Sequence, residues 1–171
     1  KLFKDKIILI TGGSGFLGQA LTKRILGLNP KAIRIFSRDE SKQELMEEQF
    51  QDKRLRFFIG DIRDKERLKR AMNNVDIVIH TAALKRIPIA EYNPFEFIKT
   101  NIEGSQNVID ACMDEKVKIC IGISTDKSVS PNNLYGATKL SMEKLFVAAG
   151  YFTSKKDTIF TCVRYGNVFG S

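Results

Sequence analysis

The stretch Lys6-Ile-Ile-Leu-Ile-Thr11-Gly12-Gly13-Ser14-Gly15-Phe16-Leu17-Gly18 decides the fold of this chain. It begins with a short apolar run, Ile7 to Ile10, which stops at a cluster of glycines. Apolar residues at helical spacing follow, from Ala20 to Leu28. This order of strand, tight turn and helix is the context in which the spacing Gly13-x-Gly15-x-x-Gly18 binds a dinucleotide.

The physical reason for the glycines is access to the main chain. Without Cβ atoms the turn can be tight, a pyrophosphate can approach the backbone, and the helix that follows offers free N–H groups to it. Glycines also make plain turns, but here strand, motif and helix agree. We therefore expect the cofactor phosphates to lie over Gly12, Gly13, Ser14, Gly15, Phe16, Leu17 and Gly18.

Length and composition narrow the class of protein. The 171 residues, 43% of them hydrophobic, suit one soluble domain, and no apolar run approaches the roughly 20 residues that span a bilayer. His80 is the only histidine, and the three cysteines contain no CxxC pair, which argues against a metal site or a disulfide framework. With no signal peptide visible, these features predict a cytoplasmic protein.

The formal net charge of +8 could indicate nucleic-acid binding. However, basic residues alternate with acidic ones, as in Arg63-Asp-Lys-Glu-Arg67, which is typical of solvated helix faces. A modest positive field also suits an anionic cofactor or substrate. We therefore expect no nucleic-acid partner.

Strands and helices alternate along the whole chain. Apolar runs predict strands at residues 7–10, 32–36, 55–59, 75–80, 117–123 and 158–163, and helical patterns predict helices at 41–50, 64–72, 94–113 and 134–149, with Asp64 as a cap. This predicts an α/β fold, a doubly wound parallel Rossmann sheet with helices on both faces. We expect residues 1–171 to form one NADP-binding Rossmann domain that carries the catalytic residues. A C-terminal substrate lobe is not present, so we expect the isolated chain to be inactive.

A second informative stretch holds Thr125-Asp126-Lys127 after a strand and Tyr135-Gly-Ala-Thr-Lys139 at the start of a helix. Tyr135 and Lys139 are four residues apart and share one helix face. A lysine ammonium, together with an oxidised nicotinamide, would lower the tyrosine pKa, so that the phenolate removes a proton from a sugar hydroxyl. The plainer interpretations are a core tyrosine with a surface lysine, and a surface ion pair between Asp126 and Lys127.

These residues resemble the extended short-chain dehydrogenase/reductases that act on nucleotide sugars. More narrowly, Ala82-Ala-Leu-Lys85, Ser124-Thr-Asp-Lys127, Asn133-Leu-Tyr-Gly-Ala-Thr-Lys139 and Arg164-Tyr-Gly-Asn-Val168 resemble the UDP-N-acetylglucosamine 4,6-dehydratases that invert C5, a polysaccharide-biosynthesis type. The resemblance covers nearly the whole chain. Related retaining dehydratases have a glutamate in the place of Lys127.

The resemblance implies a role for each catalytic residue. Tyr135 would accept the proton of the C4 hydroxyl, supported by Lys139 and Thr125. Lys127 would abstract the C5 proton, and Asp126 would protonate the departing C6 hydroxyl. Opposite proton roles in adjacent residues require an environment that separates their pKa values. The further contacts expected are Asp61 and Ile62 beside adenine, the small residues Ala82 and Ala83 along the ligand, and Lys85 and Asn167 at the substrate or nicotinamide.

The choice of cofactor has its own signal. An acidic residue about 20 positions after the glycines favours NAD, whereas a basic one favours NADP. Arg38 comes first after the second strand, with Ser37 before it and Lys42 one turn later, although Asp39 is also present. Three donors around one dianion favour NADP. A merely solvated Arg38 is the alternative.

Three functions remain open. The leading hypothesis is a dehydratase that acts on a UDP-sugar, in the cytoplasm, as a homo-oligomer in the full-length protein. A nucleotide-sugar 4-epimerase or reductase would share Tyr135 and Lys139 but has no use for Lys127 as a base. A nucleotide-binding module without turnover would keep the scaffold alone.

Overall fold

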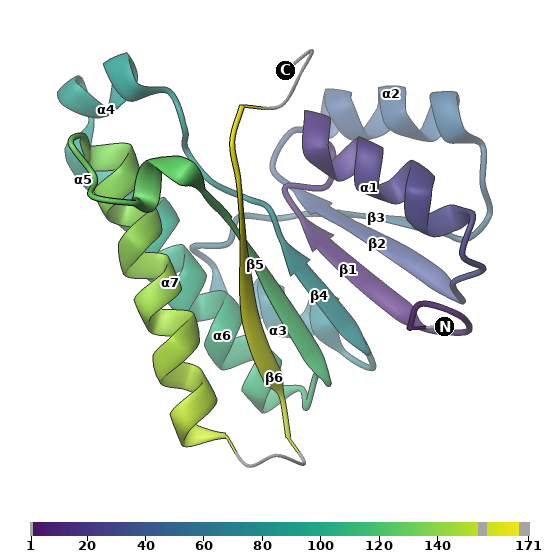
Figure 1. The fold of residues 1–171 in the computed structure, drawn as a ribbon. Coiled ribbons are helices and arrows are strands. Elements are labelled where there is room, and N and C mark those ends of the chain that lie inside the picture. The colour runs from purple at the N-terminus through teal and green to yellow at the C-terminus, as the bar shows by residue number, and fades with distance from the viewer. Residues whose placement is uncertain (1, 154–156, 168–171) are drawn as a thin grey trace.

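The structure is a computed structural model that describes residues 2–153 and 157–167. Its centre is one six-stranded parallel sheet in the order β3-β2-β1-β4-β5-β6 (Figure 1). The strands are β1 Ile7–Thr11, β2 Ala32–Ser37, β3 Leu55–Ile59, β4 Ile77–His80, β5 Ile119–Thr125 and β6 Ile159–Tyr165. From β1 the chain adds β2 and β3 towards one edge of the sheet and then β4, β5 and β6 towards the other, so the strand order reverses between β1 and β4, as expected of a doubly wound fold.

Helices cover both faces of this sheet. On one face lie α1 (Phe16–Leu26) and α2 (Glu40–Phe50), and on the other lie α3 (Lys65–Met72), α6 (Gly104–Asp114) and α7 (Leu134–Phe152) (Figure 1). The predicted fold class is confirmed.

The core explains this layering. Successive strand residues point to opposite faces, so Ile8 and Ile10 of β1 pack towards α1 and α2, whereas Leu9 packs towards α3 and α6. All three are fully buried. Burying each such side chain stabilises the fold by about 1.5–3 kcal/mol. Because both faces are covered, ligands reach the sheet mainly at its ends.

Side chains fix where several helices begin. The Asp64 carboxylate accepts a hydrogen bond from the Arg67 amide at 2.9 Å, which confirms the predicted cap of α3. Asp39 accepts from the Lys42 amide at 3.0 Å at the start of α2, and Asn133 accepts from Gly136 at 2.9 Å at the start of α7. Removing such a cap costs about 1 kcal/mol.

The segment after β4 differs from the prediction. Residues expected to form a loop contain a short helix, α4 (Ile87–Tyr92), and the helix predicted over residues 94–113 is not uniform. It consists of α5 (Pro94–Ile98), a π-helical turn (Lys99–Glu103) and α6. The reason is tertiary: inside the π turn, Asn101 donates to the Leu84 carbonyl and accepts from the Leu84 amide, both at 2.8 Å. Local propensity does not reveal such a turn.

The last two strands run further than expected. β5 continues to Thr125 and β6 to Tyr165, each two residues beyond the predicted ends. Asp126–Ser128 then form a single 3-10 turn. The predicted catalytic stretch therefore begins on the strand itself and continues into this turn.

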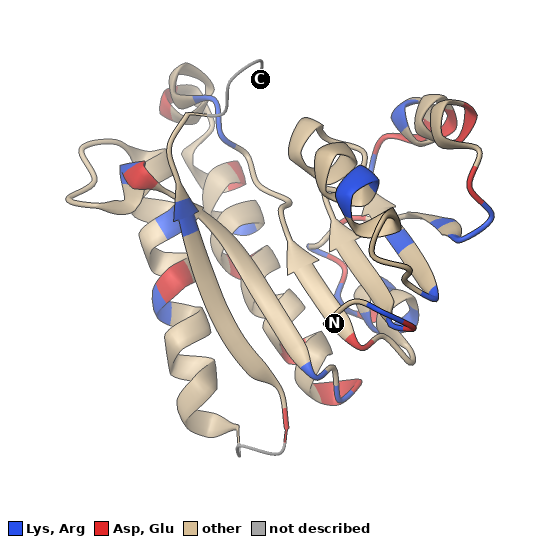
Figure 2. Cartoon of the chain, turned by 45° about the vertical axis from the view of Figure 1, so that its right-hand side comes forward, with Lys and Arg blue, Asp and Glu red and all other residues tan. Residues whose placement is uncertain are grey.

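Figure 2 shows Lys and Arg residues interspersed with Asp and Glu residues along the helices and loops. This agrees with the alternation read from the sequence. Among the described residues, no helix has the length and apolar character that crossing a membrane requires.

Candidate active site at the carboxyl ends of β1, β4 and β5

A pocket of about 350 Å³ lies at the carboxyl end of the sheet, beside the reversal between β1 and β4. Open α/β sheets bind their ligands at this place. Every residue expected to bind the cofactor lines the pocket except Gly13: Gly12, Ser14, Gly15, Phe16, Leu17, Gly18, Ser37, Arg38, Lys42, Asp61, Ile62, Ala82, Ala83, Tyr135 and Lys139. Lys85 lines it as well.

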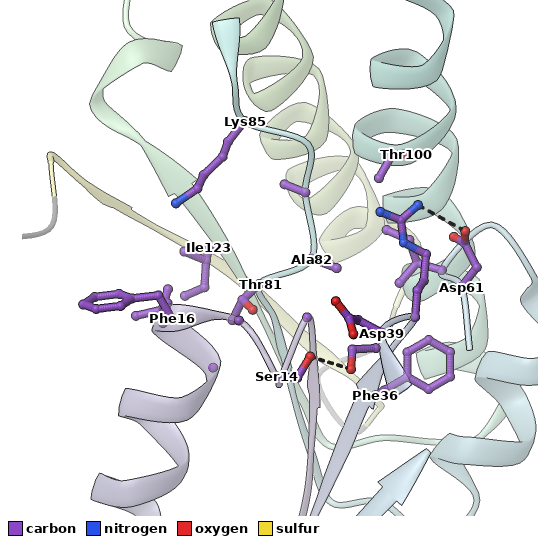
Figure 3. A pocket seen from close by; sticks show the side chains of 18 of the residues that line it. Ser14, Phe16, Phe36, Asp39, Asp61, Thr81, Ala82, Lys85, Thr100 and Ile123 are labelled. Atoms are coloured by element: carbon purple, nitrogen blue, oxygen red, sulfur yellow. Dashed lines mark hydrogen bonds and ion pairs between the residues drawn. The ribbon is translucent and has the colours of Figure 1, made fainter. Parts of the chain in front are cut away.

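The pocket is elongated. Figure 3 shows Phe16, Ile123 and Lys85 on one side and Phe36 and Asp61 on the other, with Ala82 between them. The Gly-rich turn after β1 thus lies between an end formed by the tips of β2 and β3 and an end formed by β5 and α7.

Two glycines show why this turn requires glycine. Gly12 has φ +66°, and a Cβ there would stand 2.9 Å from the backbone of Ala82. A Cβ on Gly18 would overlap the carbonyl oxygen of Gly13. Gly13 itself faces Ile10 and Ile35, which explains why it does not line the pocket. The turn brings the N-terminus of α1 to the pocket, where its amides can meet an anion.

At the β2 end, the basic side chains are already partly engaged. Arg38 lies 3.6 Å from the Asp61 carboxylate, and Lys42 lies 3.0 Å from Asp39. Asp39 caps α2 at the same time, and hydrogen bonds from Lys42 hold its pKa below the ordinary value. Asp39 therefore caps the helix and pairs with Lys42 while it also lines the pocket beside Arg38 (Figure 3).

The Ser37 hydroxyl adds a donor at this end. Its Oγ accepts hydrogen bonds from Ser14 Oγ at 2.8 Å and from Gln43 Nε2 at 2.9 Å. A hydroxyl has one hydrogen and two acceptor sites. With both acceptor sites filled, the Ser37 hydrogen can point to a ligand.

At the other end, α7 places Tyr135 and Lys139 together, as their spacing predicts. Lys139 is only 3% exposed, and its Nζ lies 3.1 Å from Met142 Sδ. Burial lowers the Lys139 pKa to about 8. Burial also raises the pKa of Tyr135, with the Thr125 side chain opposing. The predicted fall in the Tyr135 pKa requires an oxidised nicotinamide as well as Lys139, so it stays a prediction; in the chain by itself desolvation outweighs the neighbouring groups.

The stretch Thr125-Asp126-Lys127 lies beside the pocket rather than in its lining. Lys127 Nζ is 3.2 Å from the Asp126 carboxylate and 3.0 Å from Asn167 Oδ1, which brings a third predicted residue to this place. Thr125 Oγ1 donates to Asp126 at 2.9 Å. Hydrogen bonds from Thr125 and Lys127 lower the Asp126 pKa, whereas a proton donor needs a raised one.

The structure adds a polar chain that the sequence analysis did not single out. His80 is fully buried between Thr11 Oγ1 at 2.7 Å and Ser105 Oγ at 2.9 Å, and burial lowers its pKa to about 3. The Ser105 hydroxyl donates to the Asn101 carbonyl, and Asn101 Nδ2 donates to Thr138 on α7. This chain links the glycine turn to the helix of Tyr135.

Glu143 was also missed. It is only 8% exposed and lies four residues after Lys139, which itself lies four residues after Tyr135. The sequence held a signal for it, because the spacing places this carboxylate on the same helix face as Tyr135 and Lys139.

The described residues contain no group of His, Cys, Asp and Glu that could hold a metal ion. Cys112, Cys120 and Cys162 are free thiols; the first two are buried and Cys162 is partly buried. Burial and the Glu143 charge raise the Cys162 pKa to about 12, so this thiol is not a ready nucleophile.

Curated relatives match the chain from end to end. It is 57% identical over 171 residues to a protein of Campylobacter jejuni named UDP-N-acetylglucosamine 4,6-dehydratase (inverting), a match that covers 99% of this chain and 51% of the relative. It is 45% identical over 174 aligned residues to a protein of Rickettsia prowazekii named UDP-glucose 4-epimerase, with the same coverage. The chain thus spans about half the length of these relatives.

Solved structures share its fold. An X-ray structure of Pen from Bacillus thuringiensis superposes with a TM-score of 0.95 at 48% identity, over 99% of this chain and 52% of that one. A UDP-glucose 4-epimerase from Brucella ovis in complex with NAD has a TM-score of 0.81 at 24% identity, over 95% of this chain and 52% of that one. At that identity the second match shows the fold alone.

A protein-family model matches residues 8–171, nearly the full length of the chain, under the description "Polysaccharide biosynthesis protein". The match begins inside β1 and includes the glycine turn, the Thr125-Asp126-Lys127 stretch and the Tyr135–Lys139 pair. The chain belongs to this polysaccharide biosynthesis protein family.

Proposed function

We propose that this chain is the cofactor-binding and catalytic part of a 4,6-dehydratase that converts UDP-N-acetylglucosamine to a 4-keto-6-deoxy sugar with C5 inverted. The observation that carries the proposal is that two proton-transfer pairs lie near one another, one lining an end of the pocket and the other in the turn beside it. Tyr135 and Lys139 come from α7, and Asp126 and Lys127 from the turn after β5. The 57% identity to a protein of that name supports it.

The residues present fit a nicotinamide dinucleotide. The glycine turn and the N-terminus of α1 suit its pyrophosphate, the Asp61 and Ile62 end suits adenine, and the Tyr135 end suits nicotinamide. A complex with NAD among the structural neighbours agrees with this class of cofactor. When bound, the nicotinamide takes up hydride from C4 of the sugar and returns it to C6.

Of the two forms, NADP suits the β2 end better. Ser37, Arg38 and Asp39 all line the pocket there, but the Asp39 carboxylate already accepts from the Lys42 amide and pairs with the Lys42 ammonium. A 2′-phosphate would compete with Asp61 for the Arg38 guanidinium, and a dianion attracts it more strongly than one carboxylate does.

Tyr135 takes the proton of the C4 hydroxyl in this scheme. Its pKa is raised in the chain alone, so the phenolate needs positive charge nearby. Lys139 supplies one such charge from the helix turn below, and with a pKa of about 8 it is protonated at neutral pH. Thr125 opposes the rise from the other side.

Lys127 removes the C5 proton, which the C4 ketone has made acidic, and Asp126 protonates the departing hydroxyl. Both side chains are partly exposed, with Asp126 57% and Lys127 34% accessible. A substrate that covers them excludes water, and desolvation raises a carboxyl pKa while it lowers that of an ammonium. Those are the directions that an acid and a base need.

We expect the rest of the substrate site in the other half of the full-length protein, because the chain spans about half of its relatives. The isolated chain should then bind cofactor but turn over little sugar, since catalysis needs the substrate held at near-attack distance.

The decisive experiment uses a full-length protein that contains this chain. With UDP-N-acetylglucosamine in deuterated water, mass spectrometry should show loss of one water, and NMR should place solvent deuterium at C5. Lys127→Ala should still allow reduction of bound cofactor by the sugar, which uses Tyr135, but should slow water loss at least 100-fold, the lower end of what general acid–base catalysis contributes. Lys144→Ala, an exposed lysine on α7, is the matched control.

A second function has a specific observation in its favour: relatives named UDP-glucose 4-epimerase are 45% identical to the chain. An epimerase would invert C4 without loss of water and would be indifferent to Lys127. Undiminished water loss by the Lys127→Ala variant contradicts the role of this lysine. A C4 epimer formed without water loss would favour the epimerase instead.

A further inference from the structure

Glu143 is the point at which the two proton-transfer pairs are joined. Its side chain is 10% exposed, and four donor atoms lie within hydrogen-bond distance of its carboxylate. One of them, Ser128 Oγ, shares its single hydrogen between Glu143 and the Thr125 carbonyl oxygen, which lies 2.7 Å away. Ser128 Oγ lies 2.8 Å from Oε1, and Arg164 reaches Oε1 with Nε at 2.9 Å and Oε2 with Nη2 at 2.7 Å. Ser124 Oγ donates to Oε1 as well.

These donors come from three different elements. Ser124 lies near the end of β5, Ser128 ends the turn that holds Asp126 and Lys127, and Arg164 lies on β6. Glu143 itself lies on α7, one turn after Lys139. One side chain thus connects the helix of the first pair to the turn of the second.

The backbone agrees with this connection. Gly136, next to Tyr135, packs directly on the turn, since a Cβ there would overlap the carbonyl oxygen of Lys127. The turn therefore lies against α7 at two places, at its first turn through Gly136 and two helical turns later through Glu143.

We propose that Glu143 is a positioning residue that holds the turn Asp126–Ser128 against α7, so that Lys127 and Tyr135 can reach the same sugar substrate. The inference rests on the proposed dehydratase function, because only a reaction that uses both pairs needs them in a fixed relation. Glu143 does not line the pocket and acts on the turn through Ser128.

The charge of Glu143 is part of this role. The Arg164 guanidinium, followed by the two serines, lowers the Glu143 pKa to about 2 against the effect of burial. The carboxylate therefore stays ionised at neutral pH and acts only as an acceptor. A glutamine has nearly the same shape, but its NH₂ group would face the Arg164 donors. Two donors cannot bond to each other, so the hydrogen bond to Arg164 on that side would be lost.

The first test is structural and needs no substrate. In the full-length protein, hydrogen exchange of the amides from Thr125 to Val129 should be at least ten-fold faster in Glu143→Gln than in the unsubstituted protein, while amides of β1 and β4 stay unchanged. Ser128→Ala, which removes one donor and keeps the Arg164 pair, should change exchange in the same direction. Glu48→Gln, an exposed carboxylate on α2, is the matched control.

The second test separates the two chemical steps. Reduction of bound cofactor by the sugar depends on Tyr135. Followed at 340 nm at a pH well below the Lys139 pKa of about 8, where Lys139 keeps its charge, it should fall less than three-fold in both variants. Loss of water depends on Lys127 and should fall at least ten-fold, and KM should stay within two-fold. A residue that merely stabilised the fold would lower both steps together.

Unchanged exchange of the turn, or an equal fall in both steps, overturns the proposal. Ser128→Ala decides the matter if Glu143→Gln does not fold. If the unsubstituted protein releases no water from UDP-N-acetylglucosamine, the proposed function is wrong, and the exchange rates alone then decide whether Glu143 holds the turn.

Discussion

Replacing Lys139 with methionine should make the cofactor-free protein more stable while abolishing its chemistry. Lys139 is 3% exposed, and burial lowers its pKa from 10.5 to about 8. At about 1.4 kcal/mol for each pH unit, this fall corresponds to about 3 kcal/mol by which the buried ammonium opposes folding at neutral pH. Methionine has a similar length and needs no hydration.

The expected gain in the free energy of unfolding is about 2–3 kcal/mol at pH 7, since part of the apolar contact already exists through the lysine stem. Urea denaturation followed by circular dichroism measures it. Lys144→Met on the exposed side of the same helix should stay within about 0.5 kcal/mol of the unsubstituted protein.

The pH dependence of the free energy of unfolding tests whether the buried Lys139 is charged. The folded-state pKa lies below the unfolded one, so the cost of Lys139 is complete below about pH 8 and disappears as the pH rises towards 10.5. The advantage of Lys139→Met should shrink over the same range. A variant that is less stable at pH 7, or whose advantage does not change between pH 7 and 10, would refute the assignment of a buried charged lysine.

Three further outcomes are expected. Arg38→Ala should weaken NADP binding at least ten-fold and NAD binding less than two-fold in calorimetric titrations, since a hydrogen bond to a charged group contributes about 1.5–3 kcal/mol; equal affinities of the unsubstituted protein for both cofactors would contradict NADP preference. Gly18→Ala should lower the free energy of unfolding by about 1–3 kcal/mol because its Cβ overlaps the Gly13 carbonyl, whereas Gly150→Ala, whose Cβ meets no atom within 4 Å, should not be destabilising. The free energy of unfolding should fall as the pH drops below about 6.5. The one histidine, His80, binds a proton near pH 6.5 when the chain is unfolded but has a pKa of about 3 in the folded protein, so acid favours the unfolded state. A free energy of unfolding that does not change between pH 6.5 and 5 would contradict the burial of His80.

Much of this fold follows from local patterns. The apolar runs and the glycine turn were enough to predict six parallel strands, and Asp64 was enough to place the start of α3. What they missed depends on contacts between distant residues. The π turn exists because Asn101 reaches back to Leu84, and β5 continues to Thr125 because it pairs with Tyr165 of β6.

Much of the pocket lining was also predictable from spacing, since residues four apart on a helix share a face and strand ends meet at one edge of the sheet. The stretch Thr125-Asp126-Lys127 lies beside that lining, and Lys85 and Asn167 were named from the family resemblance. The protonation of the site residues was not predictable. Tyr135 and Asp126 have pKa values displaced in the direction opposite to the one expected from their roles. Burial sets the first, and the partners Thr125 and Lys127 set the second. Both depend on packing that spacing does not encode.

The buried charges of α7 show how these effects fit together. Lys139 and Glu143 lie one turn apart, and the carboxylate raises the lysine pKa against the fall that burial causes. With a pKa of about 8, the ammonium outnumbers the amine by about ten to one at pH 7. Without the Glu143 charge the lysine pKa would fall further, and part of the lysine would be neutral at the pH where Tyr135 needs a cation. The Arg164 pair that keeps Glu143 ionised thereby also supports the charge of Lys139, so the alkaline halves of the pH profiles of cofactor reduction and of water loss should both move to lower pH in Glu143→Gln. Cys162, the other titratable group that raises the Lys139 pKa, has a pKa of about 12, so it is neutral at that pH and cannot replace the lost charge.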